Sequence, residues 1–139
     1  VVITTSDALS EAVRVPNTLI RNAGEYSFFS SGMPGYWSVS KPVVGYVGAI
    51  SHWFDAAMVA AAAKRFPGYD FILVGAHVDA NLTSLEGLSN IHYKYEQPYN
   101  RLPDMVASFD VCLIPFVMHH PLSRFTNPVK VYEYLAAGK

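Results

Sequence analysis

Short, unbroken apolar runs are the feature that most constrains the fold of this chain. A run that is apolar at every position is typical of a strand buried on both faces, as in a parallel sheet. Such strands need helices on both sides of the sheet to cover them. Four runs of this kind are present, at Val1–Thr4, Val43–Val47, Phe71–Val74 and Val111–Pro115.

Segments with helical features alternate with these runs. The first has Ser6 or Asp7 as its candidate N-cap, and the last combines an N-capping Asn127, Pro128 at the first helical position and Gly138 as a C-terminal stop. Strand followed by helix, repeated, predicts an α/β fold with a Rossmann-like, doubly wound and mostly parallel sheet. The candidate helices are Ser6–Val13, His52–Phe66, Arg101–Phe109 and Asn127–Ala137.

A different kind of segment interrupts this alternation. Gly32–Pro42 is rich in Gly, Pro and Ser, which is typical of a linker or a long loop. Residues 1–31 are therefore expected to belong to a different structural unit from residues 43–139. The chain stops at Lys139, directly after a strong helix, where a doubly wound domain would continue with another strand. We therefore expect the domain to be incomplete.

Composition excludes several classes of protein. Hydrophobic residues make up 51% of the 139 residues and charged residues 15%, so a disordered chain is excluded. A net charge of -1 gives no basic footprint for nucleic acid. One cysteine cannot form an internal disulfide or a multi-Cys zinc site. The longest apolar stretch, around residues 56–63, is too short for a membrane span, and no basic segment of a signal peptide opens the chain.

A glycine turn follows the second apolar run. The segment Gly45-Tyr-Val-Gly48-Ala-Ile-Ser51 lies between that strand and the next helix. Ligands bind beyond the carboxyl ends of strands in such sheets, and glycine lets a phosphate approach the backbone closely. Two interpretations stay open: Gly48 faces a phosphate, or it only permits a tight turn.

The start of the last helix is a second candidate site. The free amides of the first turn, over Thr126–Val129, and the ammonium group of Lys130 would attract phosphate oxygens. Glu133 lies one turn further on, where a carboxylate could accept hydrogen bonds from vicinal sugar hydroxyls. The alternative is an exposed ion pair between Lys130 and Glu133, with little energetic weight.

The loop after the fourth run offers weaker candidates. Arg124 could contact phosphate, and the paired His119-His120 lack a third ligand at metal-binding spacing, so no metal site is expected. The chain has no Asp-x-Asp pair, no Walker lysine motif and no G-x-S-x-G nucleophile elbow. The tyrosines Tyr93, Tyr95 and Tyr99 are interpreted as core and surface filler.

Together these segments resemble the retaining GT-B glycosyltransferases of the group-1 type. The most specific likeness is Asn127-Pro-Val-Lys-Val-Tyr-Glu-Tyr-Leu-Ala-Ala-Gly-Lys139, which resembles the donor-site helix of that family. Val43–Gly48, Tyr69–Gly75 and Phe109–Phe116 look like the opening and middle of its nucleotide-sugar domain. Asn22-Ala-Gly-Glu-Tyr-Ser-Phe-Phe29 looks like the stretch that ends its acceptor domain.

The resemblance implies a division into domains and a set of site residues. Residues 1–36 would end the acceptor domain and its linker, and residues 41–139 would form the incomplete donor domain. The bound base is expected near residues 75–77 and 95–98. The residues expected to bind the donor nucleotide sugar are Gly48, Gly75, Thr126, Asn127, Val129, Lys130 and Glu133, and those expected to act in catalysis are Lys130 and Arg124.

Three positions depart from the family pattern. Ala49 and Phe54 stand where the family has basic residues that neutralise the diphosphate, and Phe125 stands where it has the first glutamate of its Glu-x7-Glu motif. We interpret these departures as a subfamily trait. Charge neutralisation would then come from Lys130, Arg124 or groups outside this chain.

The resemblance also implies a function. A sugar, of hexosyl type, would be transferred with retention from a nucleotide diphosphate to the hydroxyl of a glycan or lipid-linked acceptor, without metal or cofactor. Cell-envelope or exopolysaccharide synthesis in the cytoplasm, at the inner membrane face, is the expected setting. The fragment alone is expected to be inactive and to self-associate. A GT-B nucleotide-sugar epimerase and a non-catalytic nucleotide-binding module stay open as alternatives.

Overall fold

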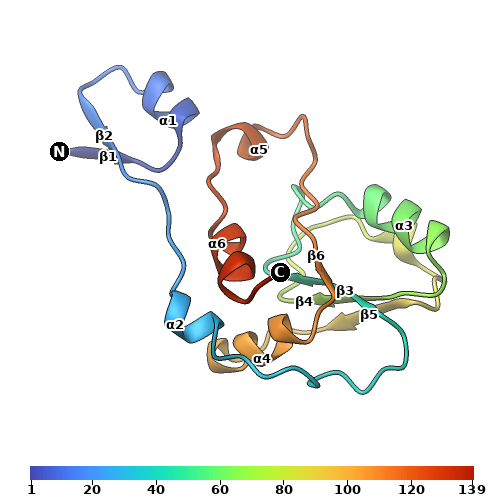
Figure 1. The fold of residues 1–139 in the computed structure, drawn as a ribbon. Coiled ribbons are helices and arrows are strands. Elements are labelled where there is room, and N and C mark those ends of the chain that lie inside the picture. The colour runs from blue at the N-terminus through green and yellow to red at the C-terminus, as the bar shows by residue number, and fades with distance from the viewer.

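A four-stranded parallel sheet forms the centre of the molecule. The computed structural model describes all residues 1–139 and is shown in Figure 1. The strands lie in the order β5-β4-β3-β6, and every neighbouring pair is parallel. The predicted α/β class with a parallel sheet is therefore confirmed. The strands are β3 (Val43–Val47), β4 (Asp70–Val74), β5 (Ile91–Lys94) and β6 (Val111–Cys112).

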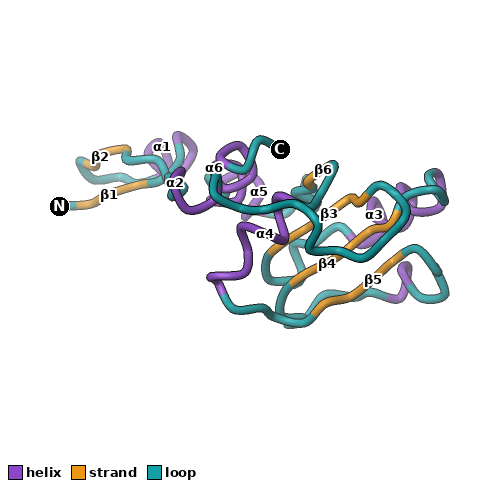
Figure 2. The backbone as a smooth tube through the Cα atoms, turned by 60° about the horizontal axis from the view of Figure 1, so that its bottom comes forward, coloured by secondary structure: helices purple, strands orange, loops and turns teal.

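Helices cover both faces of this sheet. On one face, α3 (Ala56–Arg65) packs Val59 and Ala60 on Phe71 and Leu73 of β4. On the other face, α4 (Leu102–Ala107) and α6 (Val129–Ala136) pack on Ile72 and Val74 of the same strand. Alternate residues of β4 thus point to opposite cores, so a run apolar at every position is what the fold requires. The two helical layers are visible in Figures 1 and 2.

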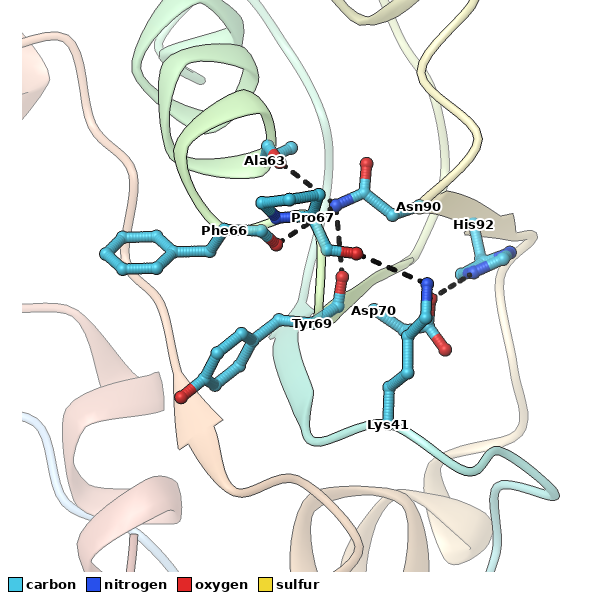
Figure 3. Close-up of polar contacts among 8 residues, drawn as sticks. All are labelled: Lys41, Ala63, Phe66, Pro67, Tyr69, Asp70, Asn90 and His92. Atoms are coloured by element: carbon cyan, nitrogen blue, oxygen red, sulfur yellow. Dashed lines mark hydrogen bonds and ion pairs between the residues drawn. The ribbon is translucent and has the colours of Figure 1, made fainter.

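The ends of α3 are set by polar side chains. Asp55 caps the start by accepting a hydrogen bond from the Met58 amide at 2.8 Å, so the helix begins at Ala56 and not at His52 as predicted. Beyond the end of α3, the side-chain amide of Asn90 donates to the carbonyls of Ala63 and Tyr69, both at 3.0 Å (Figure 3). Figure 3 also shows Asp70 accepting from His92 at 3.2 Å, with Lys41 at 3.7 Å.

A smaller parallel sheet lies apart from the first (Figure 1). It consists of β1 (Val2–Thr4) and β2 (Asn17–Leu19), joined by α1 (Asp7–Ala12). Ser6 caps α1 by accepting from the Leu9 amide at 3.2 Å, which confirms one of its two candidate N-caps.

A short helix and a packed segment connect the two sheets. Helix α2 (Tyr26–Phe29) buries Phe29, and residues 32–42 contain no helix or strand, as predicted. This segment is attached to α4: the Tyr36 amide donates to Ser108 Oγ at 2.8 Å, and Trp37 Nε1 donates to the Met105 carbonyl at 3.2 Å.

Several elements differ from the sequence predictions. Strand β6 spans two residues and not the five predicted, and β2, β5 and α2 were not predicted, nor was α5 (Pro121–Phe125). Two 3₁₀ turns, η1 (Thr83–Leu85) and η2 (Tyr99–Arg101), complete the elements. None of the helices is both long and apolar enough to cross a membrane.

The predicted N-cap of α6 was wrong, and the predicted glycine at its C-terminal end was right. The N-cap is Pro128, and the Asn127 side chain makes no capping bond because it is engaged by the N-terminal segment. At the other end, Gly138 adopts a φ of 73° and the Lys139 amide donates to the Tyr134 carbonyl at 2.9 Å, so the glycine stop is confirmed.

Candidate functional site

The largest pocket lies beyond the carboxyl ends of β3 and β4. It has a volume of about 620 Å³ and is closed on one side by the loop after β5 and the start of α4. This is where ligands bind in open α/β sheets. Its lining residues are Val47, Gly48, Ala49, Val74, Gly75, Ala76, Glu96, Gln97, Pro98, Tyr99 and Leu102.

Two glycines form the floor of this pocket. Gly48 and Gly75 end β3 and β4 with φ values of 146° and 145°, which L side chains rarely adopt. A Cβ on Gly75 would collide with the Gly48 carbonyl oxygen, and a Cβ on Gly48 would lie 2.5 Å from Lys130 Nζ. The floor therefore requires glycine at both positions, in part to bring Lys130 this close.

Lys130 is the cation that lies against the glycine floor. Its Nζ is 5.3 Å from the centroid of the Tyr46 ring, and it forms no ion pair with a carboxylate. Burial lowers the pKa of Lys130, and nearby Glu133 partly opposes that shift. The exposed Lys130–Glu133 ion pair considered from the sequence is absent, so this cation has no carboxylate partner in the structure.

Two tyrosines that the sequence did not single out bond the end of β3, and one of them, Tyr134, anchors α6 there. The Val47 amide donates to the Tyr134 hydroxyl at 3.0 Å, and the Tyr46 hydroxyl donates to the Ala49 carbonyl at 2.8 Å. Burial raises the pKa of both phenols well above their usual range, so both stay protonated. Their signal in the sequence was weak because tyrosine is common in ordinary cores.

Glu133 lies one helical turn beyond Lys130. Burial raises its pKa, and Lys130 partly offsets that increase. Tyr99, on the pocket wall, also has a raised pKa, first because of burial and then because of the Glu133 and Glu25 carboxylates. Glu133 is therefore close enough to both Lys130 and Tyr99 to shift the pKa of each.

The other predicted binding residues of this region lie away from the pocket wall. Asn127 Oδ1 accepts from the Asn22 amide at 3.0 Å and from the Tyr132 hydroxyl at 3.2 Å. The Thr126 amide donates to the Leu122 carbonyl at 2.8 Å, so it is not free for phosphate, and Val129 is 41% exposed. Arg124 is exposed on α5, with its guanidinium 5.4 Å from the Phe125 ring centroid.

A second polar cluster joins the loops after β3, β4 and β6. Asp79 accepts from Ser51 and from the His52 amide, and its other oxygen lies 3.0 Å from His52 Nδ1. The hydrogen bond from Ser51, and then that from His52, lowers the pKa of Asp79. The His120 ring lies 4.9 Å from His52. No group of three or more His, Cys, Asp or Glu side chains has a metal-binding arrangement.

The departures from the family pattern have structural consequences. Phe54 is 4% exposed and packs against the Tyr46 ring at 5.1 Å, so its position belongs to the core. Ala49 lines the pocket and leaves its rim without a cation there.

The chain is similar to a curated glycosyltransferase in sequence and to a solved structure in fold. No protein-family model matches the chain. It is 26% identical over 131 residues to "Putative teichuronic acid biosynthesis glycosyltransferase TuaH" of Bacillus subtilis (strain 168), covering 86% of this chain and 32% of that protein. The structure of sucrose-phosphate synthase (tll1590) from Thermosynechococcus elongatus superposes with a TM-score of 0.65 at 18% identity, covering 82% of this chain and 34% of that one.

These matches agree with the motifs read from the sequence. The superposition shows a shared fold, and the sequence match links that fold to a glycosyltransferase. The chain spans about a third of the length of either protein. The sequence motifs, the parallel sheet and these two matches together support the resemblance of this chain to the GT-B glycosyltransferases of the group-1 type.

Proposed function

We propose that this chain supplies the donor-binding part of a glycosyltransferase that transfers a sugar from a nucleotide diphosphate to an acceptor hydroxyl. The observation that carries the proposal is the position of Lys130, an unpaired and half-buried cation against the Gly48–Gly75 floor. A diphosphate on that floor would lie close to backbone and to Lys130. Withdrawal from water strengthens the attraction between the two charges.

Stabilisation of the leaving diphosphate is the chemical task of this end of the pocket. Negative charge develops on the diphosphate as the bond to the sugar breaks. A preorganised cation lowers the energy of that state without proton transfer. We propose that Lys130 performs this role, without a metal ion. Arg124 would contribute only if its exposed loop moved toward the pocket.

Nucleotide recognition would use the other end of the pocket. The Glu133 carboxylate can accept hydrogen bonds from the two ribose hydroxyls. The base would lie against residues 75–76 and 96–98, which line the pocket and include much of the region expected from the sequence. We propose that the acceptor hydroxyl comes from the remaining part of the protein, and that closure of the two parts completes the site.

The nature of donor and acceptor follows from the family resemblance and the relative's name. We propose a retaining transfer of a hexosyl unit to a glycan or lipid-linked acceptor. Because the Bacillus relative is named for teichuronic acid biosynthesis, we place the reaction in cell-envelope polysaccharide synthesis, at the cytoplasmic face of the membrane.

A non-catalytic nucleotide-binding module is the second candidate. The observation that favours it is the absence of a cation at Ala49, on the pocket rim. Transfer activity of the full-length protein with a panel of nucleotide sugars separates the two functions, because a binding module would retain affinity without turnover.

Calorimetry on the full-length protein tests the proposed site. At least one of the uridine, guanosine, adenosine and thymidine diphosphates should bind, and Glu133→Ala should weaken that binding about tenfold or more, as expected when hydrogen bonds to a charged group are lost. Glu86→Ala, at an exposed glutamate outside the pocket, is the matched control. Unchanged affinity in Glu133→Ala would refute its role.

A further inference from the structure

Eight residues of the N-terminal part, Asn22–Phe29, lie against the two elements that carry one end of the pocket. Helix α2 contacts both α4 and α6 (Figure 1). Asn22 attaches the start of α6: its amide donates to Asn127 Oδ1 at 3.0 Å, and its side chain donates to the Asn127 carbonyl at 2.5 Å. The segment therefore fixes where the helix bearing Glu133 begins.

Gly24 brings the same segment directly onto Glu133. A Cβ at Gly24 would lie 3.0 Å from the backbone carbon of Tyr132 and 3.1 Å from the Glu133 amide nitrogen. The two backbones are thus in van der Waals contact at this point. A displacement of the segment would therefore act on the Tyr132–Glu133 backbone as well as on Asn127.

Phe28 contacts the pocket wall through Tyr99. The Phe28 and Tyr99 rings are stacked, with centroids 5.2 Å apart and planes at 13°, and Phe29 meets Tyr99 edge-on at 6.0 Å. Phe29 is 1% exposed and Tyr99 is 55% exposed. One face of Tyr99 is therefore backed by the N-terminal segment, while the residue itself lines the pocket.

Tyr99 and Glu133 form a donor and an acceptor at the same end of the pocket. A tyrosine hydroxyl is protonated at neutral pH, and burial and the nearby carboxylates raise the pKa of Tyr99 further. A phenol that donates and a carboxylate that accepts suit a vicinal diol, whose hydroxyls do both. The opposite end is built from Gly48 and Gly75, which follow β3 and β4, and from Lys130, which lies on α6 with its Nζ against Gly48.

We propose that Asn22–Phe29 is a positioning element for the ribose end of the pocket, and that Tyr99, backed by Phe28, binds the ribose hydroxyls beside Glu133. The proposal rests on the proposed function, because it takes the ligand to be a nucleoside diphosphate. It makes the Tyr99 wall of the pocket, and not the glycine floor, depend on Phe28 of the N-terminal part.

Two kinds of ligand, nucleoside diphosphates and pyrophosphate, are compared on the full-length protein to test whether Phe28 acts through Tyr99 alone. Uridine, guanosine and adenosine diphosphates and inorganic pyrophosphate are titrated by calorimetry into the unaltered protein and into Phe28→Ala. Loss of the aromatic pair should weaken nucleoside diphosphate binding about fivefold. Pyrophosphate affinity should stay within about twofold, because the phosphate end does not change. Phe28→Tyr should restore binding, and Tyr26→Ala, at an exposed tyrosine of the same helix, is the control.

A second variant keeps the test sharp if Phe28→Ala fails to fold. Tyr99→Phe retains the stack and removes only the hydroxyl of a half-exposed side chain. It should weaken ribonucleoside diphosphates about fivefold and leave their 2′,3′-dideoxy forms unaffected, because those lack the hydroxyls that Tyr99 binds.

The outcomes separate this inference from the proposed function. Unchanged nucleoside diphosphate affinity in Tyr99→Phe, or an equal loss for pyrophosphate in Phe28→Ala, would overturn the positioning role while the pocket remained a nucleotide site. Absence of any nucleotide binding to the unaltered protein would refute the proposed function and this inference with it.

Discussion

The four-stranded sheet buries apolar side chains on both of its faces, whereas the two-stranded sheet buries almost none. Tyr46, Val59 and Leu73 are all at 0% exposure in the larger sheet and its helices. In the smaller sheet and α1, the buried residues are the polar Thr4 and Ser6, and Ile3 is 58% exposed. The larger sheet therefore has its own hydrophobic core, and the smaller one depends on its neighbours.

The way the two sheets are joined follows from this difference. The smaller sheet is attached by polar contacts, such as Ser6 Oγ donating to the Phe125 carbonyl at 2.7 Å. Phe29 is the apolar residue of the N-terminal part that is fully buried, and it lies in the core shared with α4 and α6. The glycine floor thus stands on the stable sheet, while α6, which carries both Lys130 and Glu133, is in contact with the less stable part.

The difference in stability between the two regions is tested most strongly by removing one apolar side chain from each. Phe109 is 1% exposed and stacks on Trp37 at 5.9 Å, so Phe109→Ala should lower the free energy of unfolding by about 3–5 kcal/mol. Ile20 is 54% exposed just after β2, and Ile20→Ala should cost less than about 0.5 kcal/mol. Denaturant unfolding measures both, and equal losses would contradict two sheets of unequal stability.

A smaller effect is expected from the polar attachment of the two-stranded sheet. Ser6→Ala removes the cap of α1 and the bond to Phe125, and should cost about 1 kcal/mol. We expect the loss to appear locally, as hydrogen exchange that is about fivefold faster in α1. Faster exchange in β3 and β4 as well would show that the two sheets unfold together.

The smallest expected effect is a change in how the free energy of unfolding depends on pH. Because burial raises the folded-state pKa of Glu133, its contribution favours folding below the unfolded pKa and is lost as pH rises through the folded value. Glu133→Gln should therefore leave stability at neutral pH equal or slightly higher and flatten its decline between weakly acidic and neutral pH. Thermal melts across that range provide the measurement, and a steeper decline in the variant would reverse the sign.

The parts of the fold that the sequence predicted are those that local chemistry determines. Continuous apolar runs located β3 and β4, and Gly138 located the end of α6. Strand β5 was not recognised because it lies at the sheet edge and carries His92 and Lys94. All four side chains of β5 are at least partly exposed, so its sequence lacks the unbroken apolar pattern of a strand buried on both faces.

The candidate site was predictable to a similar extent. The position of Gly48 and Gly75 follows from the rule that ligands bind at carboxyl strand ends. The contact of the Lys130 side chain with Gly48 and the hydrogen bond between Asn22 and Asn127 could not be predicted, because both join segments far apart in the chain. Tyr99 was interpreted as filler for the same reason: its partner Phe28 comes from the N-terminal part.

Titration of inorganic pyrophosphate into the full-length protein and into Lys130→Met tests the central claim, that Lys130 and the glycine floor form a diphosphate site. Lys64→Met, at an exposed lysine of α3, is the control. The account predicts that Lys130→Met weakens pyrophosphate binding about tenfold or more, because a partly desolvated charge pair is lost, while Lys64→Met binds like the unaltered protein. Equal pyrophosphate affinity in all three proteins would contradict it.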